Sequence, residues 1–131
     1  CALPIFQEPL LFPHLSIGAN IELSMHRCRG TAHRVRVDQL LKDLGLGGMA
    51  TQDPFQLSRG QMMRVAVARA LAPRARVLLL DEPLSALDTE TREQVRQVIF
   101  EQVRHDEAYG ILVTHHSEDR PVGGDVVCLT R

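Results

Sequence analysis

The spacing of apolar and polar residues predicts two helices in the first third of the chain. Pro9 and Pro13 keep the first segment extended until a short helix opens near Ser16 or Gly18. A second helix is predicted over residues 31–44, with Thr31 as its N-cap. Its apolar stripe consists of Val37, Leu40, Leu41 and Leu44.

A third helix follows a turn that is rich in glycine. The turn contains Gly45, Gly47 and Gly48. The pair Asp53-Pro54 then breaks the chain, and the helix begins at Ser58, with Gln61 at the position that completes a capping box. We expect this helix to end at about Leu71.

The second half of the chain predicts a parallel sheet. Residues 76–80 form a short, continuous apolar run, which is typical of a strand buried on both faces. A helix over residues 89–105 crosses back to a second strand that starts at Gly110, which predicts a right-handed crossover. The apolar face of this helix contains Val95, Val98, Ile99 and Val103. A last strand is expected over residues 125–129.

Composition narrows the class of protein. The chain has 131 residues, 44% of them hydrophobic, and a net charge of -1, which describes one ordinary soluble globular domain. Its basic residues are spread along the chain, which argues against nucleic-acid binding. No apolar run approaches the ~18 to 20 residues of a membrane span, so any membrane role is predicted to be peripheral.

The cysteines and histidines do not form a metal-binding pattern. Cys1, Cys28 and Cys128 are odd in number and lack CxxC spacing, so neither a disulfide framework nor a zinc site is favoured. The histidines show no HxxxH or HExxH pattern. We expect His115 and His116 to point to opposite sides of an extended segment.

The first five residues, CALPI, match one reading frame of a common sequencing-adapter end. We expect residues 1–5 to be a non-native scar rather than a targeting signal, and the source DNA across Phe6 would decide this. On this interpretation the natural chain divides into a helical part over residues 6–75 and an α/β part over residues 76–131.

An acidic pair ends the first strand of the α/β part. Open parallel sheets bind ligands at the carboxyl ends of their strands, where Mg²⁺ or its waters could neutralise Asp81. Glu82 turns to the other side and could polarise a water for attack on a γ-phosphate. An acidic pair on its own is more often a solvated turn, so the catalytic interpretation depends on the motifs around it.

The helix that begins at Ser58 presents unpaired N–H groups and a partial charge of about +0.5, which can receive an anion. A serine-capped structural helix is an equally common explanation. The dipole contributes roughly 0.3–1 kcal/mol and each hydrogen bond to charge about 1.5–3 kcal/mol, against an association cost of ~4–15 kcal/mol. This helix end would therefore have to share a nucleotide with another site.

Five sequence elements occur in the order of a known family. They are Gln7, residues 57–61 (LSRGQ), residues 77–82 (VLLLDE), residues 85–88 (SALD) and His115. Together they resemble the nucleotide-binding subunit of an ABC transporter over nearly the whole chain. The resemblance implies an α/β fold with the C-terminal part of a P-loop NTPase (RecA-like) core, parallel strands and an ABC-type α-helical subdomain. It also implies ATP and Mg²⁺ as cofactors.

The resemblance implies a role for each catalytic residue. Gln7 would contact Mg²⁺ or the attacking water and sense the membrane partner. Asp81 would hold Mg²⁺ through water. Glu82 and His115 would act on the nucleotide of their own subunit.

The remaining motif residues are implied to bind nucleotide across a head-to-tail dimer with a second ABC subunit. The LSGGQ-like residues that would face the nucleotide of that subunit are Ser58, Arg59, Gly60 and Gln61. Ser85 and Asp88 match the loop that crosses between the two sites.

Four features depart from the family pattern. Arg59 stands where the family often has glycine, and His116 replaces the usual acidic neighbour of the switch histidine. Residues 115–125 are shorter than the helix-bearing stretch of the family, and Pro121 prevents a helix from continuing. The chain also lacks a P-loop, because its single lysine, Lys42, has no Gly-Lys-Ser/Thr context. We expect the P-loop upstream of Phe6 and no ATP turnover by the 131 residues alone.

The complete protein is expected to power import of a small solute from the cytoplasmic face of the bacterial inner membrane. Its expected partners are permease subunits, contacted through the Q-loop and the helical subdomain, and a solute-binding protein, without nucleic acid. The apolar groove for the permease would contain Leu10, Leu11, Phe12 and Leu15. The alternatives are a soluble ABC-type ATPase of DNA repair or chromosome maintenance and a non-catalytic interaction fragment.

Overall fold

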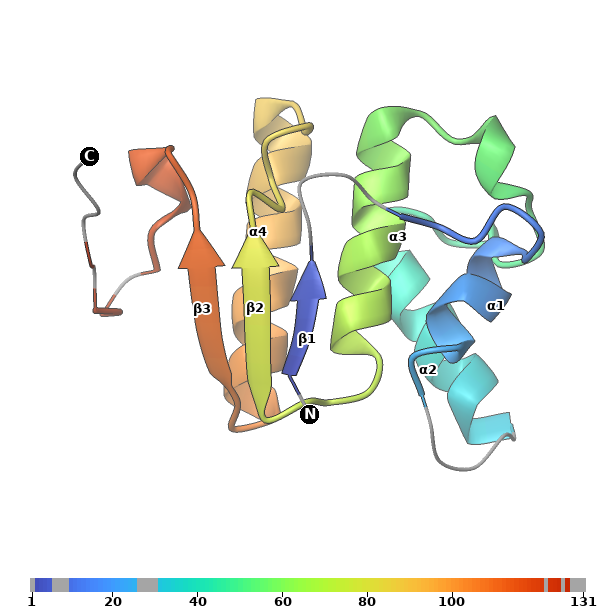
Figure 1. Cartoon of the computed structure of the whole chain (residues 1–131), viewed down its shortest axis with the longest axis horizontal. Helices are drawn as coiled ribbons and strands as arrows, with labels where there is room; N and C mark the ends of the chain where they lie inside the picture. Colours follow the sequence, from blue (N-terminus) through green and yellow to red (C-terminus); the bar gives the residue numbers. More distant parts are fainter. Residues whose placement is uncertain (1, 6–9, 26–30, 122, 126, 128–131) are drawn as a thin grey trace.

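In a computed structural model, the chain forms a small sheet with a group of helices beside it (Figure 1). The structure describes residues 2–5, 10–25, 31–121, 123–125 and 127. Its elements are β1 (Ala2–Ile5), α1 (Ile17–Glu22), α2 (Thr31–Asp43), η1 (Pro54–Gln56), α3 (Arg59–Leu71), β2 (Val77–Asp81), α4 (Thr89–His105), β3 (Tyr109–Val113) and η2 (Ser117–Asp119).

The three strands are parallel and lie in the order β1-β2-β3. Helix α4 leads from β2 to β3 behind the sheet, which gives the expected right-handed crossover (Figure 1). Its apolar face packs as predicted, with Val95 and Ile99 no more than 2% exposed. Beyond β3, Asp125 and Val127 lie in no strand, and the rest of the strand expected over residues 125–129 includes residues outside the described part.

Strand β1 was not predicted from the sequence. Its four residues pair in register with β2, from Ala2 opposite Val77 to Ile5 opposite Leu80. Pro4 is compatible with this place, because β1 is an edge strand of the described sheet. The strand does not test whether residues 1–5 are a non-native scar, because only the source DNA can decide that, so the scar stays a prediction.

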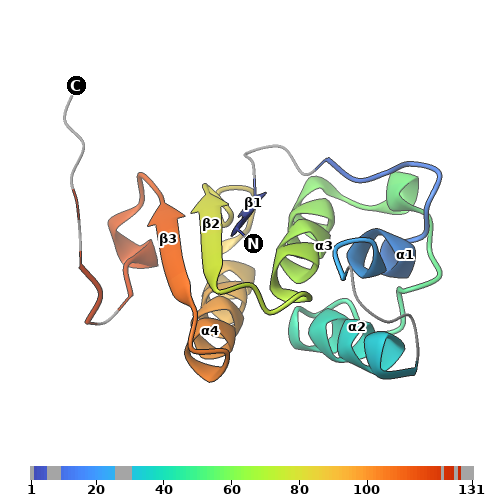
Figure 2. The ribbon, with the colours of Figure 1, turned by 60° about the horizontal axis from the view of Figure 1, so that its bottom comes forward.

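Helices α1, α2 and α3 pack together on one side of the sheet (Figure 2). Ser16 caps α1 as expected, and Gly45 ends α2 with a φ of +71°. The predicted stripe of α2 is at most 2% exposed and packs in one core with α1 and α3. This core contains Ile17, Ile21, Val37, Leu40, Leu41, Leu44, Met63 and Val67, among others.

Polar contacts join α2 to α4. Arg36 Nη2 donates to Gln102 Oε1 at 2.8 Å, and Gln94 Nε2 donates to the Asp43 carbonyl oxygen at 3.0 Å. Burial lowers the pKa of the Arg36 guanidinium. The helical part is therefore fastened to the crossover helix by hydrogen bonds.

The sheet face opposite α4 is open. Tyr109, Ile111 and Val113 are 77%, 54% and 50% exposed on β3, and they share this face because alternate residues of a strand point the same way. Gly110, on the other face, lies against Val103 of α4. No helix in the described residues is long and apolar enough to cross a bilayer.

Candidate functional site

Most of the predicted site residues lie at one end of the molecule. The carboxyl ends of β2 and β3 and the N-terminal ends of α3 and α4 point the same way (Figure 1). This places Ser58, Asp81, Asp88 and His115 on the same end of the fold. Gln7 lies outside the described residues.

Glu82 follows β2 in a strained conformation. Its φ is +49°, a value that side chains with a Cβ rarely adopt and that costs on the order of 1–3 kcal/mol. Its N–H donates to the Val113 carbonyl oxygen at 2.9 Å, and its own carbonyl oxygen accepts from Ser85 Oγ at 3.0 Å. The neighbouring strand and the following turn thus hold a side chain that is 8% exposed.

Glu82 and His115 meet directly. Glu82 Oε1 accepts the His115 backbone N–H at 3.0 Å and lies 2.6 Å from His115 Nδ1. Because an ionised carboxylate can only accept, Nδ1 carries the proton of this contact and Nε2 is left free. The His115 side chain is 68% exposed, so its Nε2 edge can face a ligand.

The second carboxylate oxygen of Glu82, Oε2, is buried and has no hydrogen-bond partner among the residues that the structure describes. An unmet buried acceptor costs about 1–3 kcal/mol, more when it is charged. Because Oε2 has almost no exposed surface, a water or ligand hydroxyl could reach it only if the surrounding chain moved. Such a water would remove the cost and could give up a proton to Glu82, which is the role of a general base.

Asp81 differs from its neighbour in exposure. It ends β2 opposite Val113 and its side chain is exposed, so its charge needs no protein partner. An exposed carboxylate at the carboxyl end of a parallel strand is an oxygen ligand that fits Mg²⁺ bound through water. Within the described residues, no group of three or more His, Cys, Asp and Glu side chains is arranged to hold a metal directly.

The predicted capping box begins α3. Ser58 Oγ accepts from Gln61 N at 3.2 Å, and Gln61 Oε1 accepts from Ser58 N at 2.9 Å. The N–H groups of Arg59 and Gly60 precede the first intrahelical donor and remain available to an anion. The box and the anion site can therefore coexist on one helix end.

Gly60 also lies against the loop after Glu82. A Cβ at this position would stand 3.3 Å from the Ala86 carbonyl oxygen and 3.4 Å from Leu87 Cδ2. Helix α3, which carries the LSGGQ-like residues at its start, and the loop 85–88 are thus in close contact. No pattern in the sequence predicted this contact.

Ser85 and Asp88 have local structural partners. Ser85 bonds Glu82, as described above, and Asp88 caps α4 by accepting the Thr91 N–H at 3.0 Å. This backbone hydrogen bond lowers the pKa of the Asp88 carboxyl. Both side chains are exposed.

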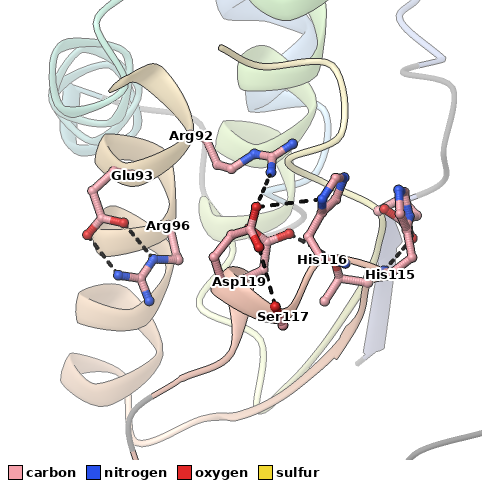
Figure 3. Close-up of polar contacts among 10 residues, drawn as sticks. Arg92, Glu93, Arg96, His115, His116, Ser117 and Asp119 are labelled. Atoms are coloured by element: carbon pink, nitrogen blue, oxygen red, sulfur yellow. Dashed lines mark hydrogen bonds and ion pairs between the residues drawn. The ribbon is translucent and has the colours of Figure 1, made fainter. Parts of the chain in front are cut away.

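His115 and His116 do not point to opposite sides, which corrects the expectation from the sequence. Their ring centroids are 4.0 Å apart, because the chain turns after β3 instead of remaining extended. The turn is closed by a hydrogen bond from His116 N to Thr114 Oγ1 at 3.1 Å and continues into the short η2. Figure 3 shows this turn with Asp119, a buried residue that the sequence analysis missed.

The family model and the similar proteins all indicate the same family. A family model described as ABC transporter matches residues 4–85. The chain is 41% identical over 117 residues to the Fe(3+) ions import ATP-binding protein FbpC of Haemophilus influenzae, which covers 88% of this chain and 33% of that protein. It is 42% identical over 116 residues to the molybdenum import ATP-binding protein ModC of Methylococcus capsulatus, covering 88% and 32%.

A solved structure shares the fold. The dimeric post-hydrolysis state of the ATP-binding cassette MJ0796, bound to ADP and Pi, superposes with a TM-score of 0.81 at 34% identity, over 90% of this chain and 53% of that one. The expected α/β cassette fold is confirmed. The chain spans about a third of the two import proteins and about half of the solved cassette.

Proposed function

The chain belongs to the ABC transporter family, and from that premise we propose that it supplies the signature helix and the hydrolytic corner of an import ATPase. The observation that carries this proposal is the contact of His115 with one oxygen of Glu82, while the other oxygen is buried and unpaired. This arrangement suits activation of a water beside a phosphate.

Hydrolysis would then proceed through residues of this corner. Once Glu82 Oε2 is uncovered in the nucleotide-bound protein, it would take a proton from the water that attacks the γ-phosphorus, and the bond between that phosphorus and the leaving oxygen of ADP would break, which releases phosphate. His115 keeps Glu82 Oε1 occupied and presents Nε2 toward the transferred group. Mg²⁺, held through water by Asp81 and by Gln7, would neutralise phosphate charge.

Each nucleotide would be shared by two subunits in a head-to-tail dimer. The N–H groups at the start of α3 would meet the γ-phosphate bound by the partner, since one helix end cannot offset the cost of association alone. Ser58 would add its hydroxyl, Arg59 and Gln61 would flank the phosphate, and Ser85 and Asp88 would lie near the subunit boundary. The solved cassette, which is a dimer bound to ADP and Pi, supports this arrangement.

A P-loop segment outside these 131 residues would complete the fold. Parallel sheets are normally covered on both faces, yet Tyr109 and Ile111 are more than half exposed on the open face. We propose that the segment that carries the P-loop packs there, upstream of Phe6. The matched import proteins are about three times as long as the matched region, which leaves room for such a segment.

The relatives favour import over the alternatives. The complete protein would bind permease subunits through the Q-loop and helical part, with Leu10 and Phe12, which are 67% and 44% exposed, at the contact. It would act peripherally at the cytoplasmic face of a bacterial inner membrane, with a solute-binding protein delivering the solute. The import proteins named above give no support to a DNA-repair ATPase.

Restoring the upstream segment tests the proposal. A chain completed from its source gene should hydrolyse ATP, whereas the 131 residues alone should not. Glu82→Gln should lower kcat by about 10² to 10⁴ and leave nucleotide binding intact. Glu107→Gln is a matched control, because Glu107 has the same φ of +49°. The proposal would be refuted if the 131 residues alone hydrolysed ATP, or if Glu82→Gln left hydrolysis by the completed chain unchanged. A completed chain that does not hydrolyse ATP would identify an interaction fragment.

A further inference from the structure

A polar network fastens the turn after β3 to helix α4 (Figure 3). Arg92 Nη1 lies 3.4 Å from Glu118 Oε1. One helical turn later, Arg96 Nη1 donates to the Arg120 carbonyl oxygen at 3.3 Å. The two contacts hold Glu118 and Arg120, which are the residues directly before and after Asp119.

Asp119 is only 1% exposed, which is unusual for a carboxylate. Its Oδ2 accepts from Thr114 Oγ1 at 2.8 Å. Arg96 donates two hydrogen bonds to Glu93, which raise the pKa of the Arg96 guanidinium, and the charge of Asp119 raises it to a smaller extent. Among the described residues, Asp119 Oδ1 is buried without a hydrogen-bond partner, so the Thr114 hydroxyl is the group that holds this carboxylate.

Thr114 connects Asp119 to the chain segment that contains His115. Its hydroxyl donates to Asp119 and accepts from His116 N, which uses both of its hydrogen-bonding functions. The residue between Thr114 and His116 is His115, which contacts Glu82 through its backbone N–H and its ring. Because the His115 side chain is 68% exposed, packing alone does little to fix it.

We infer that Thr114 and Asp119 are positioning residues that hold His115 against Glu82. The inference rests on the proposed function, which makes His115 and Glu82 the working pair. In this chain a buried carboxylate takes the place of the helix-bearing stretch that the family resemblance implied after the histidine, and the residues on either side of it are held by Arg92 and Arg96 of α4.

Backbone hydrogen exchange, measured by NMR on the 131-residue chain without nucleotide, tests the inference. Thr114→Val should accelerate exchange at the His116 amide and also at the His115 amide by roughly three- to tenfold, the equivalent of one net hydrogen bond. Thr114→Ser keeps the hydroxyl and should restore both rates. The Ala72 amide in α3 provides a reference for global stability. Acceleration at His116 alone would overturn the inference.

A second variant decides the question if Thr114→Val does not fold. Asp119→Ala removes a buried charge and is expected to fold, with the same acceleration at His115 and a ¹⁵N shift of the His115 ring that reports loss of the fixed Nδ1–H form. A folded Asp119→Ala chain with an unchanged His115 would overturn the inference. Glu101→Gln, on exposed α4 surface, should change neither amide. Since no nucleotide is used, this result is independent of whether the completed protein hydrolyses ATP.

Discussion

Arg69 Nη1 donates a 2.7 Å hydrogen bond to the carbonyl oxygen of Leu10. The bond joins the helix that begins after Ser58 to the segment before α1. The far end of this segment is held by buried Asn20, whose Oδ1 accepts the Phe12 N–H at 2.7 Å and whose Nδ2 donates back to the Phe12 carbonyl oxygen at 3.1 Å. A proposed contact with the permease is thereby tied to the signature helix.

Loss of this tie should destabilise the chain measurably. Burial lowers the pKa of Arg69, yet its guanidinium remains the charged donor to Leu10. Arg69→Leu should reduce the free energy of unfolding by about 1.5–3 kcal/mol, the usual contribution of a hydrogen bond from a charged group. Urea titration measures this. Arg104→Leu, on an exposed part of α4, serves as the control and should have little effect.

Gly60 should not tolerate a methyl group. Helix propensity alone favours alanine by about 1 kcal/mol, but the new Cβ would press on the Ala86 carbonyl oxygen at 3.3 Å. The loop cannot retreat easily because Leu87 beside it is only 9% exposed. Gly60→Ala should therefore cost a net ~1 kcal/mol in thermal unfolding. Gly47→Ala, whose Cβ would meet only ordinary contacts near 3.8 Å, should be near neutral.

Two changes at Ser58 separate its capping role from its proposed phosphate contact. Ser58→Ala should cost about 1 kcal/mol of stability, because the Gln61 N–H loses its acceptor. Ser58→Asp keeps a cap and should preserve stability, but its charge would repel a phosphate. Ser58→Asp should therefore strongly lower hydrolysis by the completed protein while it leaves the stability of the chain nearly unchanged. Equal hydrolysis by both variants would exclude phosphate contact at Ser58.

Acid should weaken the start of α4 through Asp88. The Thr91 hydrogen bond lowers its folded-state pKa, so its stabilisation is complete above the unfolded value of about 3.9 and is lost as the pH falls through the folded value. Urea midpoints of the chain and of Asp88→Asn should differ by a constant amount from about pH 5 to 7, and the difference should shrink below about pH 4. A difference that persists in acid would contradict this origin.

Local signals made much of the fold predictable. The Ser58–Gln61 box depends on residues three apart, and the stripe of α2 and the buried run of β2 depend on periodicity within one element. The capping box, the stripe of α2 and the strand itself are confirmed, but β2 is fully buried on only one face, because Val77 and Leu79 on the other face are partly exposed. By contrast, β1 has only four residues and no alternation, so nothing in its own sequence distinguishes it from a loop.

The finer parts of the site depend on contacts between distant segments. Asp119 is buried in a turn whose neighbouring residues, Glu118 and Arg120, contact Arg92 and Arg96, and these arginines lie more than twenty residues earlier in the chain. The positive φ of Glu82 follows from its bond to Val113 on the next strand. Sequence patterns identified the acid and the histidine as chemical groups, but only the fold shows which oxygen of Glu82 is free.

The boundary between α2 and α4 has a mechanical consequence. Hydrogen bonds such as those from Arg36 and Gln94 can break and re-form with new partners, whereas interlocked apolar side chains must unpack before they slide. The same apolar core, however, runs from the helical part through α3 to Val95 and Ile99 of α4, so a rotation of the helical part would have to unpack side chains as well as exchange hydrogen bonds.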